Sequence, residues 1–477
     1  MKKILLSLCL AASFYANEIE ENIQTLQTSS LTLDYLKTLP KNIKRDFFIN
    51  EYLKKNNISN DQAYEALNLI YNINNELFYN FASKFGHDET FAVAQCMNMK
   101  NSDLVDSYAD CIVNGLSLKK ASLLSSFDLN IIIQKTKDKY PAFTKKIKVI
   151  SSAIPFTRLI VQDKSNFYDI FLNVDSSFRE KYFNYKLPKR TFEKIYKNKK
   201  KFEEFLKLVL SNNKLTNLNK NLNGLDDKEL GYKSSFYLAI NAIRFKDFNK
   251  AYNYLENAKK KSSNKKFIDK VDFLEYLITK DESILKLLSS SENFNFYSYY
   301  ANELLGNKIS KDFKIDSLNE FKTILKSSNS KTIALLYAIA KSQSNLELDK
   351  VSKDLKVGIM QLKPVWIKDL SKEYNFNSFF NMEDSLTYAK AYLERLNIET
   401  NNNLLSILFK YNKEVKNLDQ ITALSAIKKD DLLTSYIKLF PLLEGNENYL
   451  LWYTLAYNKL DKKSKERLEL NTIWENL

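Results

Sequence analysis

The sequence holds little glycine, proline, cysteine or histidine: its 477 residues include 7 Gly, 6 Pro, 3 Cys and a single His. Seven glycines are too few for the many tight turns of a large β-protein. Leu, Lys, Glu, Ile and Asn are used heavily instead, and we therefore predict an all-α fold. The one histidine, His87, has nothing around it that suggests a Ser-His-Asp triad. With so few His and Cys side chains, we expect no metal site and no cofactor.

Long apolar runs are also missing. Beyond the N-terminal stretch no segment approaches 18 consecutive apolar residues, so we expect no transmembrane segment in the mature chain. Lys plus Arg exceed Asp plus Glu by 72 to 57, a net charge of +15. This charge suits an anionic partner, but the heavy use of Lys, Asn and Ile together indicates a genome-wide compositional bias. No basic run is interleaved with aromatic residues, so we expect no nucleic-acid partner.

The first 16 residues have the pattern of a secretory signal peptide. Two lysines, at positions 2 and 3, precede an apolar stretch that begins at Ile4 and is too short to span a bilayer. Cleavage after Ser13 and cleavage after Ala16 both stay open, and a buried N-terminal helix is the alternative. We expect a signal peptide over 1–16 and a periplasmic location for the mature protein.

Two cysteines, Cys96 and Cys111, remain once the signal peptide is removed. In an oxidising compartment a disulfide between them is the natural expectation. If they lie on neighbouring antiparallel helices, closing this loop stabilises the fold by roughly 3 kcal/mol in the chain-entropy model. Two buried free thiols are the alternative.

The region from 17 to 325 consists of short helical periods separated by Asn, Ser and Lys clusters. The clearest unit runs from Ser234 to Lys259, where two apolar stripes flank a turn at Phe245 to Phe248. No strict period extends over the whole region, so we expect an irregular α-superhelix built from helical hairpins. A polar stretch then places a domain boundary near residue 325. In the terminal domain, 326–477, we expect helices at about 331–344, 364–374, 384–397, 402–411 and 446–460, with Gly358, Gly445, Pro364 and Pro441 in the loops.

Six residues of the terminal domain stand at fixed spacings: Ser344, Ser352, Gly358, Met360, Gln361 and Pro364. They lie in register with the soluble lytic murein transglycosylase pattern, a helix ending in Glu-Ser-x-Phe, a second Ser eight residues later, then Gly-Leu-Met-Gln-x-x-Pro. The chain resembles this family specifically over about residues 297 to 455, and elsewhere only as an α-superhelix after a signal peptide. The resemblance implies a lysozyme-like α-helical C-terminal domain with a glycan groove at Gln343.

Other elements match the family more loosely. Tyr411 and Asn412 resemble its Ala-Tyr-Asn-Ala-Gly element, and Glu444 and Tyr449 belong to a degenerate form of its Pro-x-x-Glu-Thr-Arg-x-Tyr segment. Residues 297–306 resemble the Tyr-Tyr helix that links its two domains. The resemblance implies that the substrate-binding residues are Ser344, Ser352, Met360, Gln361, Tyr411, Glu444 and Tyr449. Core packing is an open alternative for Met360, Tyr411 and Tyr449, and helix capping for the two serines.

The family cleaves the bond between N-acetylmuramic acid and N-acetylglucosamine and forms a 1,6-anhydro ring. One glutamate gives a proton to the glycosidic oxygen and then accepts one from the C6 hydroxyl, so it must titrate. Here Gln343 stands at that position. An amide cannot perform both transfers, and this loses at least the 10²- to 10⁴-fold that acid–base catalysis contributes.

Three interpretations of Gln343 stay open: a divergent, non-catalytic binding homologue, an introduced Glu-to-Gln trap, and an enzyme with a substitute acid. Lys410, Lys413 and Glu414 also depart from the family pattern, which favours divergence. Glu347 is the nearby candidate for a substitute acid, one turn away if the helix continues. The expected partners are peptidoglycan glycan strands, with cell-wall proteins as further candidates for the superhelix.

Overall fold

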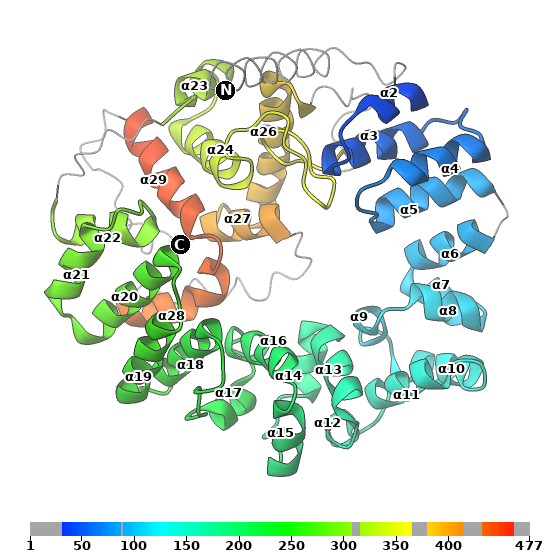
Figure 1. Ribbon diagram of the computed structural model, residues 1–477, viewed down its shortest axis with the longest axis horizontal. Helices are drawn as coiled ribbons and strands as arrows, with labels where there is room; N and C mark the ends of the chain where they lie inside the picture. Colours follow the sequence, from blue (N-terminus) through cyan, green and yellow to red (C-terminus); the bar gives the residue numbers. More distant parts are fainter. Residues whose placement is uncertain (1–30, 87–88, 308–314, 365–378, 414–431, 462–477) are drawn as a thin grey trace, which may run out of the picture. The chain divides into compact units, whose positions relative to one another are not determined.

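The computed structural model describes residues 31–86, 89–307, 315–364, 379–413 and 432–461. Within these ranges the chain is a succession of α-helices, and the β-contacts are isolated bridges that join Val351 to Val357 and Val357 to Leu362 (Figure 1). The predicted all-α fold is confirmed. The expected signal peptide and most of the helix expected at 364–374 lie outside the described residues. No helix in the described ranges has the length and apolar character to span a bilayer.

The chain folds into two compact units. Among the described residues, unit 1 comprises 31–86, 315–364, 379–413 and 442–461, and unit 2 comprises 89–307 and 432–441. Residues 31–86 therefore belong with the C-terminal part of the chain, a division that differs from the single boundary expected near residue 325.

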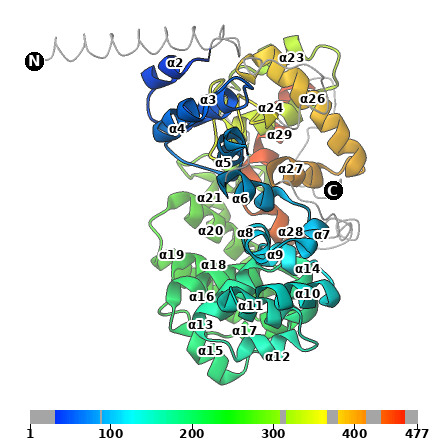
Figure 2. The same ribbon diagram turned by 90° about the vertical axis from the view of Figure 1, so that its right-hand side faces the viewer.

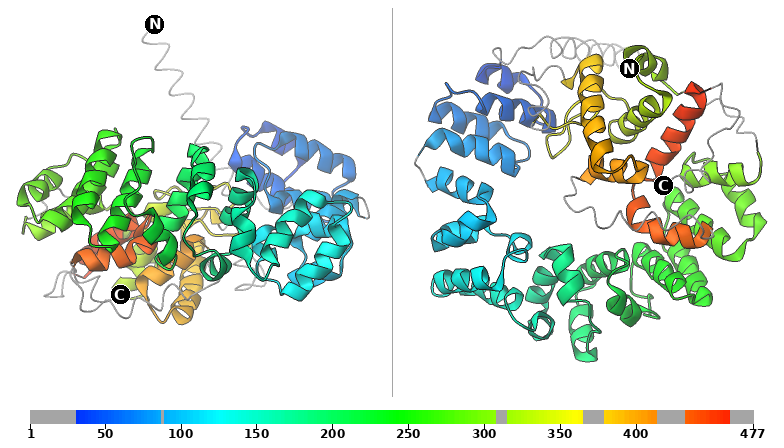
Figure 3. Two further views of the ribbon diagram at one scale, coloured as in Figure 1. Left: turned by 90° about the horizontal axis from the view of Figure 1, so that it is seen from below. Right: turned by 180° about the vertical axis from the view of Figure 1, so that it is seen from behind.

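Unit 2 is an irregular array of helices in which consecutive helices pack on one another, as Figure 2 shows for the cyan and green part of the ribbon. Its helices are α6 (Glu89–Asn98), α7 (Asn101–Asp106), α8 (Ala109–Gly115), α9 (Leu118–Ala121), α10 (Ser126–Thr136), α11 (Pro141–Ile150), α12 (Pro155–Ile160), α13 (Lys164–Asn173), α14 (Ser176–Tyr182), α15 (Lys189–Tyr196), α16 (Lys199–Leu210), α17 (Thr216–Leu222), α18 (Tyr232–Arg244), α19 (Phe248–Lys260), α20 (Lys265–Thr279), α21 (Glu282–Ser289), α22 (Phe296–Leu304) and α28 (Leu432–Leu443). Seen from below, its green helices stand side by side (Figure 3).

The hairpin of α18 and α19 forms where the two apolar stripes predict it. Ile240 on α18 and Leu255 on α19 are fully buried. The turn between the helices puts Lys246 at φ +58°, and Asp247 caps α19 by accepting a hydrogen bond from the backbone N–H of Lys250. The prediction of a helical hairpin at 234–259 is confirmed.

The core of unit 2 is held together by aromatic side chains and one disulfide. The Phe171 ring lies 4.8 Å from the Phe205 ring and 5.9 Å from the Phe183 ring, and all three are fully buried. Cys96 on α6 is joined to Cys111 on α8, so the expected disulfide is confirmed, with the short helix α7 between the two. Gly115 allows this close approach, since a Cβ there would lie 2.1 Å from the Cys96 carbonyl oxygen.

Helix α28 was not expected, because Pro441 suggested a loop. The structure corrects this: Pro441 lies inside α28. The helix is held by packing, with the Tyr436 ring 5.9 Å from Phe273 and its hydroxyl 3.3 Å from the hydroxyl of Tyr297 on α22. Burial of an apolar helix face thus outweighs the local cost of the proline.

Unit 1 is built around one buried helix. Its helices are α2 (Leu33–Thr38), α3 (Ile43–Leu53), α4 (Asn60–Leu69), α5 (Asn75–Ala82), the 3₁₀ turn η2 (Ser83–Phe85), α23 (Leu318–Ile324), α24 (Ser330–Gln343), α26 (Met382–Glu399), α27 (Leu404–Lys413) and α29 (Glu447–Leu460). Every residue of α24 from Ile333 to Ala340 is buried, the pattern of a helix surrounded by protein. Helix α29 packs along it, and α23 and α26 also contact it (Figure 1).

The N-terminal helices of unit 1 contact the rest of the unit through aromatic and polar side chains. The rings of Phe47 and Phe48 on α3 each lie 5.9 Å from the Phe380 ring. Lys44 Nζ lies 2.7 Å from an Asp349 carboxylate oxygen, and the Asn74 side-chain amide donates to the Lys353 carbonyl at 3.2 Å. Both polar contacts reach the loop that follows α24, so this loop is supported from the N-terminal part of the chain.

Candidate functional site

The candidate site begins at the C-terminal end of α24. Asn329 caps the start of this helix by accepting a hydrogen bond from the Thr332 N–H, and the helix ends at Gln343. It stops there because Asn345 and Leu346 follow with φ of +56° and +68°, in the left-handed region. The expected helix at 331–344 is confirmed, and Gln343 stands on its last turn.

Ser344 ties this helix end to the following loop. The residue is 1% exposed, and its Oγ lies 2.8 Å from the Ala340 carbonyl and 2.7 Å from the Ile359 carbonyl, to either of which it can donate. The same Oγ accepts a hydrogen bond from the Leu346 N–H at 3.1 Å. The structure thus gives Ser344 a role in capping and loop anchoring, the alternative left open by the sequence.

A tight loop from Lys350 to Leu362 faces the helix end. Gly358, at φ +73°, packs so closely that a Cβ there would lie 1.8 Å from the Phe379 carbonyl oxygen. Gln361 is 4% exposed, and its amide donates to the carbonyls of Lys350 and Gly358 at 3.0 and 2.9 Å. Gln361 was expected to face a sugar, and here its amide nitrogen closes its own loop, adding to the backbone hydrogen bonds that the same two carbonyls accept from Gly358 and Gln361.

Ser352 shapes the same loop. Its backbone N–H donates to the Lys356 carbonyl at 2.9 Å, and its Oγ accepts from the Lys356 N–H at 3.1 Å. The side chain is half-buried. Ser352 is therefore engaged in a local turn, which again favours the structural alternative over direct substrate contact.

Tyr411 on α27 contacts the same loop. It is 1% exposed, and its hydroxyl donates to the carbonyl of Met360 at 2.8 Å. Burial raises the pKa of Tyr411 well above its usual value. Met360 is itself fully buried, so both residues pack in the core of unit 1. The sequence left core packing open for Tyr411 and Met360, and their burial favours it.

Gln343 is half-buried. Its Nε2 is shielded from water and has no hydrogen-bond partner of good geometry among the described residues. Tyr449 on α29, 5% exposed, is its polar neighbour. Burial raises the pKa of Tyr449 to about 12, and the nearby Gln343 amide acts weakly in the opposite direction. Gln343 and Tyr449 are thus the two predicted site residues that the structure brings together outside the loop.

Glu347 does not take the place of the missing glutamate. Because the chain leaves the helix after Gln343, Glu347 is exposed rather than one turn along α24. Its carboxylate lies 2.9 Å from Lys350 Nζ.

Glu444 is half-buried just after the end of α28. The described residues contain no group of three or more His, Cys, Asp and Glu side chains placed to hold a metal ion.

Two features of the site were missed by the sequence analysis. Lys341, two residues before Gln343, lies over the Trp452 ring at 5.5 Å. The wall of the loop at Phe379 and its support from Lys44 come from residues remote in sequence. No local spacing pattern signals such contacts, since they depend on how distant segments pack.

The part of the chain that contains the candidate site matches a known protein-family model. Residues 323–432 match the family model described as "Transglycosylase SLT domain", a stretch that begins in α23 and includes the loop with Gly358 and Gln361. The match covers less than half of the chain. No curated protein sequence matches the chain significantly.

Similar solved structures are soluble lytic transglycosylases. The 70 kDa soluble lytic transglycosylase of Escherichia coli is 12% identical, with a TM-score of 0.43 over 97% of this chain and 93% of that chain. An inactive glutamate-to-glutamine mutant of lytic transglycosylase Slt from Pseudomonas aeruginosa is 11% identical, with a TM-score of 0.43 over 88% and 82%. A complex of the 70 kDa enzyme with bulgecin A is 12% identical, with a TM-score of 0.41 over 97% and 93%.

Proposed function

We propose that this chain binds peptidoglycan glycan strands at its transglycosylase SLT domain and does not cleave them by the family's acid–base route. The match to this domain over residues 323–432 supports the substrate class. The observation that carries the loss of cleavage is the position of Gln343, half-buried on the last turn of the central helix α24, where the motif requires an acid.

An amide at this position can still bind a sugar oxygen, although it cannot act as an acid. It donates or accepts a hydrogen bond at neutral pH, so it holds a sugar oxygen, but it has no proton to transfer. A substitute acid must lie within hydrogen-bond reach of the same glycosidic oxygen. Glu347, exposed and paired with Lys350, is not placed for that task.

Hydrogen bonds from the surrounding residues hold the loop beside Gln343 in place. Ser344, Gln361 and Tyr411 all hold the backbone of the loop that faces Gln343. A rigid loop keeps a binding surface in shape at little cost in ordering on association. We further propose that the protein works in the periplasm, the compartment expected from its N-terminal sequence, with a net charge of +15 that suits an anionic wall.

The test is co-sedimentation of the purified chain with peptidoglycan sacculi, followed by mass spectrometry of the supernatant. We expect saturable, salt-sensitive binding and no release of 1,6-anhydro muropeptides. Gln343→Leu, which keeps the size of the side chain but removes its amide, is expected to weaken binding by roughly fivefold or more, the cost of one lost hydrogen bond.

Gln134→Leu, an amide-to-leucine change at an exposed position on α10 in unit 2, is the matched control and should leave binding unchanged. Absence of sacculus binding would refute the proposed ligand. Release of 1,6-anhydro products by the unmodified protein would refute the loss of cleavage.

A further inference from the structure

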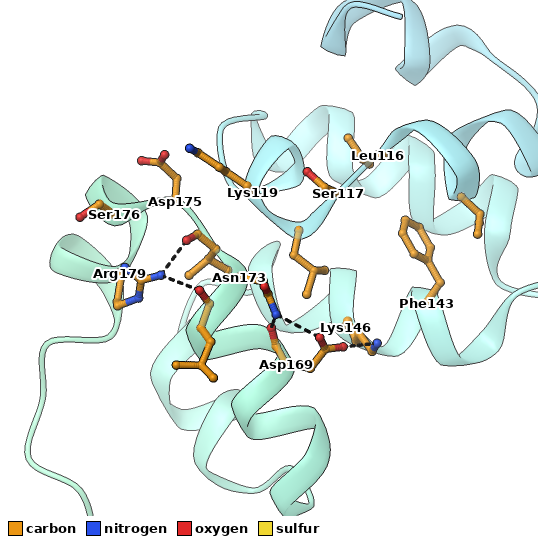
Figure 4. Close-up of a pocket in the computed structure, with 14 residues that line it drawn as sticks. Leu116, Ser117, Lys119, Phe143, Lys146, Asp169, Asn173, Asp175, Ser176 and Arg179 are labelled. Atoms are coloured by element: carbon orange, nitrogen blue, oxygen red, sulfur yellow. Dashed lines mark hydrogen bonds and ion pairs between the residues drawn. The ribbon is translucent and has the colours of Figure 1, made fainter. Parts of the chain in front are cut away.

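Unit 2 contains a cavity that takes no part in the proposed function. It has a volume of about 680 Å³, within the range of small-ligand sites. It lies between the turn before α9, the helices α11 and α13, and the start of α14, all in the helical array and none in the SLT domain (Figure 4).

One wall of the cavity is apolar. Leu116 and Val174 are 3% exposed, and Phe143 and Leu172 are half-buried beside them. An apolar wall of this kind accepts small aliphatic groups, because moving them out of water is favourable. A ligand that carries such groups would fit this wall.

The opposite wall holds a buried guanidinium. Arg179 is 5% exposed, and it donates from Nε to the Phe171 carbonyl at 2.8 Å and from Nη2 to the Leu172 and Val174 carbonyls at 3.3 and 2.8 Å (Figure 4). These partners are neutral, and no carboxylate in the described parts of the chain lies within 4 Å of the group to form an ion pair. Burial lowers the pKa of Arg179 to about 10, and the negative charges of Asp175 and Glu180 act in the opposite direction.

Some of the other charged side chains at the cavity have partners, and one has none among the described residues that forms an ion pair with it. Lys146 pairs with Asp169, which also accepts from the Asn173 amide. The Asp175 carboxylate accepts from the N–H and the hydroxyl of Ser177 at 2.9 and 2.7 Å. Lys119 is exposed at the rim, and within the described ranges it forms no ion pair. Two cations of the lining, Arg179 and Lys119, thus form no ion pair within 4 Å in the described parts of the chain.

We propose that this cavity binds a short acidic peptide, with a carboxylate between Lys119 and Arg179 and small aliphatic side chains against the apolar wall. A carboxylate there would accept charge-assisted hydrogen bonds from both cations. The Ser117 hydroxyl at the edge, which accepts from the Lys120 N–H, can still donate to a peptide carbonyl. A stem peptide of the cell wall and an acidic segment of a partner protein share this chemistry. The proposal does not depend on glycan binding at Gln343.

The test is isothermal titration of the full-length chain with the acetylated tripeptide Ala-Glu-Ala carrying a free C-terminus. The comparison ligand is acetylated Ala-Gln-Ala amide, which has the same size and no carboxylate. We expect saturable binding of the acidic peptide, at least tenfold tighter than that of the neutral one. Stem peptides released from sacculi by an amidase form a third arm, which separates the wall source from the protein source.

Three variants locate the site. Lys119→Glu should weaken binding of the acidic peptide at least tenfold by placing a like charge at the rim. Asn173→Trp, at an exposed position of the lining, should fill the cavity and abolish binding. Lys266→Glu, a matched charge reversal at an exposed lysine on α20 away from the cavity, should leave binding unchanged, and circular dichroism verifies that all three fold.

Equal binding of the acidic and neutral peptides would overturn the assignment of the ligand. Binding that survives both Lys119→Glu and Asn173→Trp would overturn the assignment of the cavity. Failure of every peptide to bind would overturn the proposal as a whole, whereas the sacculus assay on Gln343 variants would be unaffected by any of these results.

Discussion

The hydroxyl of Tyr411 donates a hydrogen bond to the carbonyl of Met360 at 2.8 Å, and both residues are buried. The two residues are 51 positions apart in the chain. This bond joins α27 to the loop that faces Gln343, and it satisfies a carbonyl that water cannot reach.

Removing this bond tests its structural role. Tyr411→Phe leaves the Met360 carbonyl without a donor, which we expect to lower the free energy of unfolding by about 1–3 kcal/mol. Tyr252→Phe, at a residue 40% exposed on α19, should change it by less than about 0.5 kcal/mol. Urea denaturation of both variants provides the comparison, and equal stabilities would contradict the assigned role.

Gly358 is the most tightly constrained position of the loop. Gly358→Ala should destabilise the protein in two ways. The left-handed backbone conformation costs an L-residue about 1–2 kcal/mol, and the new Cβ would clash with the Phe379 carbonyl oxygen, only 1.8 Å away. We expect a loss well beyond 2 kcal/mol or failure to fold. Gly445→Ala shares the positive φ, +84°, but has open space around its Cβ, so it should show the conformational cost alone. A thermal shift for Gly358→Ala no larger than for Gly445→Ala would argue against the close contact.

The ion pair between Lys44 and Asp349 connects the N-terminal helices to the candidate site. Its side chains are 20% and 43% exposed, so we expect a coupling energy of about 0.2–1 kcal/mol. A double-mutant cycle with Lys44→Ala and Asp349→Ala measures this coupling from denaturation curves. The charge-swapped pair Lys44→Asp with Asp349→Lys should recover stability that either single reversal loses. Strictly additive single effects would show that the two groups do not interact.

Tyr449 makes stability depend on pH at the alkaline end. Its pKa is raised from 10.0 to about 12, so the folded state keeps the proton that the unfolded state releases. The stabilisation is fully present below pH 10 and is lost as the pH rises from 10 to 12, an effect of about 2 kcal/mol. Tyr449→Phe should flatten the stability profile over this interval. An unchanged slope between pH 10 and 12 would contradict the raised pKa.

Much of the helical architecture follows from local sequence. The stripes at 234–259 and 331–344 have the 3.6-residue period, and both segments are helical within one or two residues of the predicted ends. The C-terminal helices at α26, α27 and α29 were likewise expected. Few glycines and prolines leave few interruptions, so periodicity is a reliable guide in this chain.

Contacts between remote segments were not predictable in the same way. Pro441 suggested a loop, yet the aromatic contacts of α28 with α20 and α22 keep it helical. The motif placed Gln361 and Ser344 near the site, but their residue type alone did not distinguish sugar contact from loop closure. That distinction depends on where the folded backbone places the carbonyls of Lys350, Gly358 and Ile359, to which the two side chains donate.

The most direct test of the central claim is to compare the purified chain with its Gln343→Glu variant on the same sacculi. Partial burial beside Tyr449 is expected to raise the pKa of the new carboxyl, as a proton donor requires. Gln134→Glu controls for an added carboxylate elsewhere. We predict 1,6-anhydro muropeptides from Gln343→Glu alone, detected by mass spectrometry. Release of these products by the unmodified chain, or their absence with Gln343→Glu although the folded variant still binds sacculi, would contradict the account.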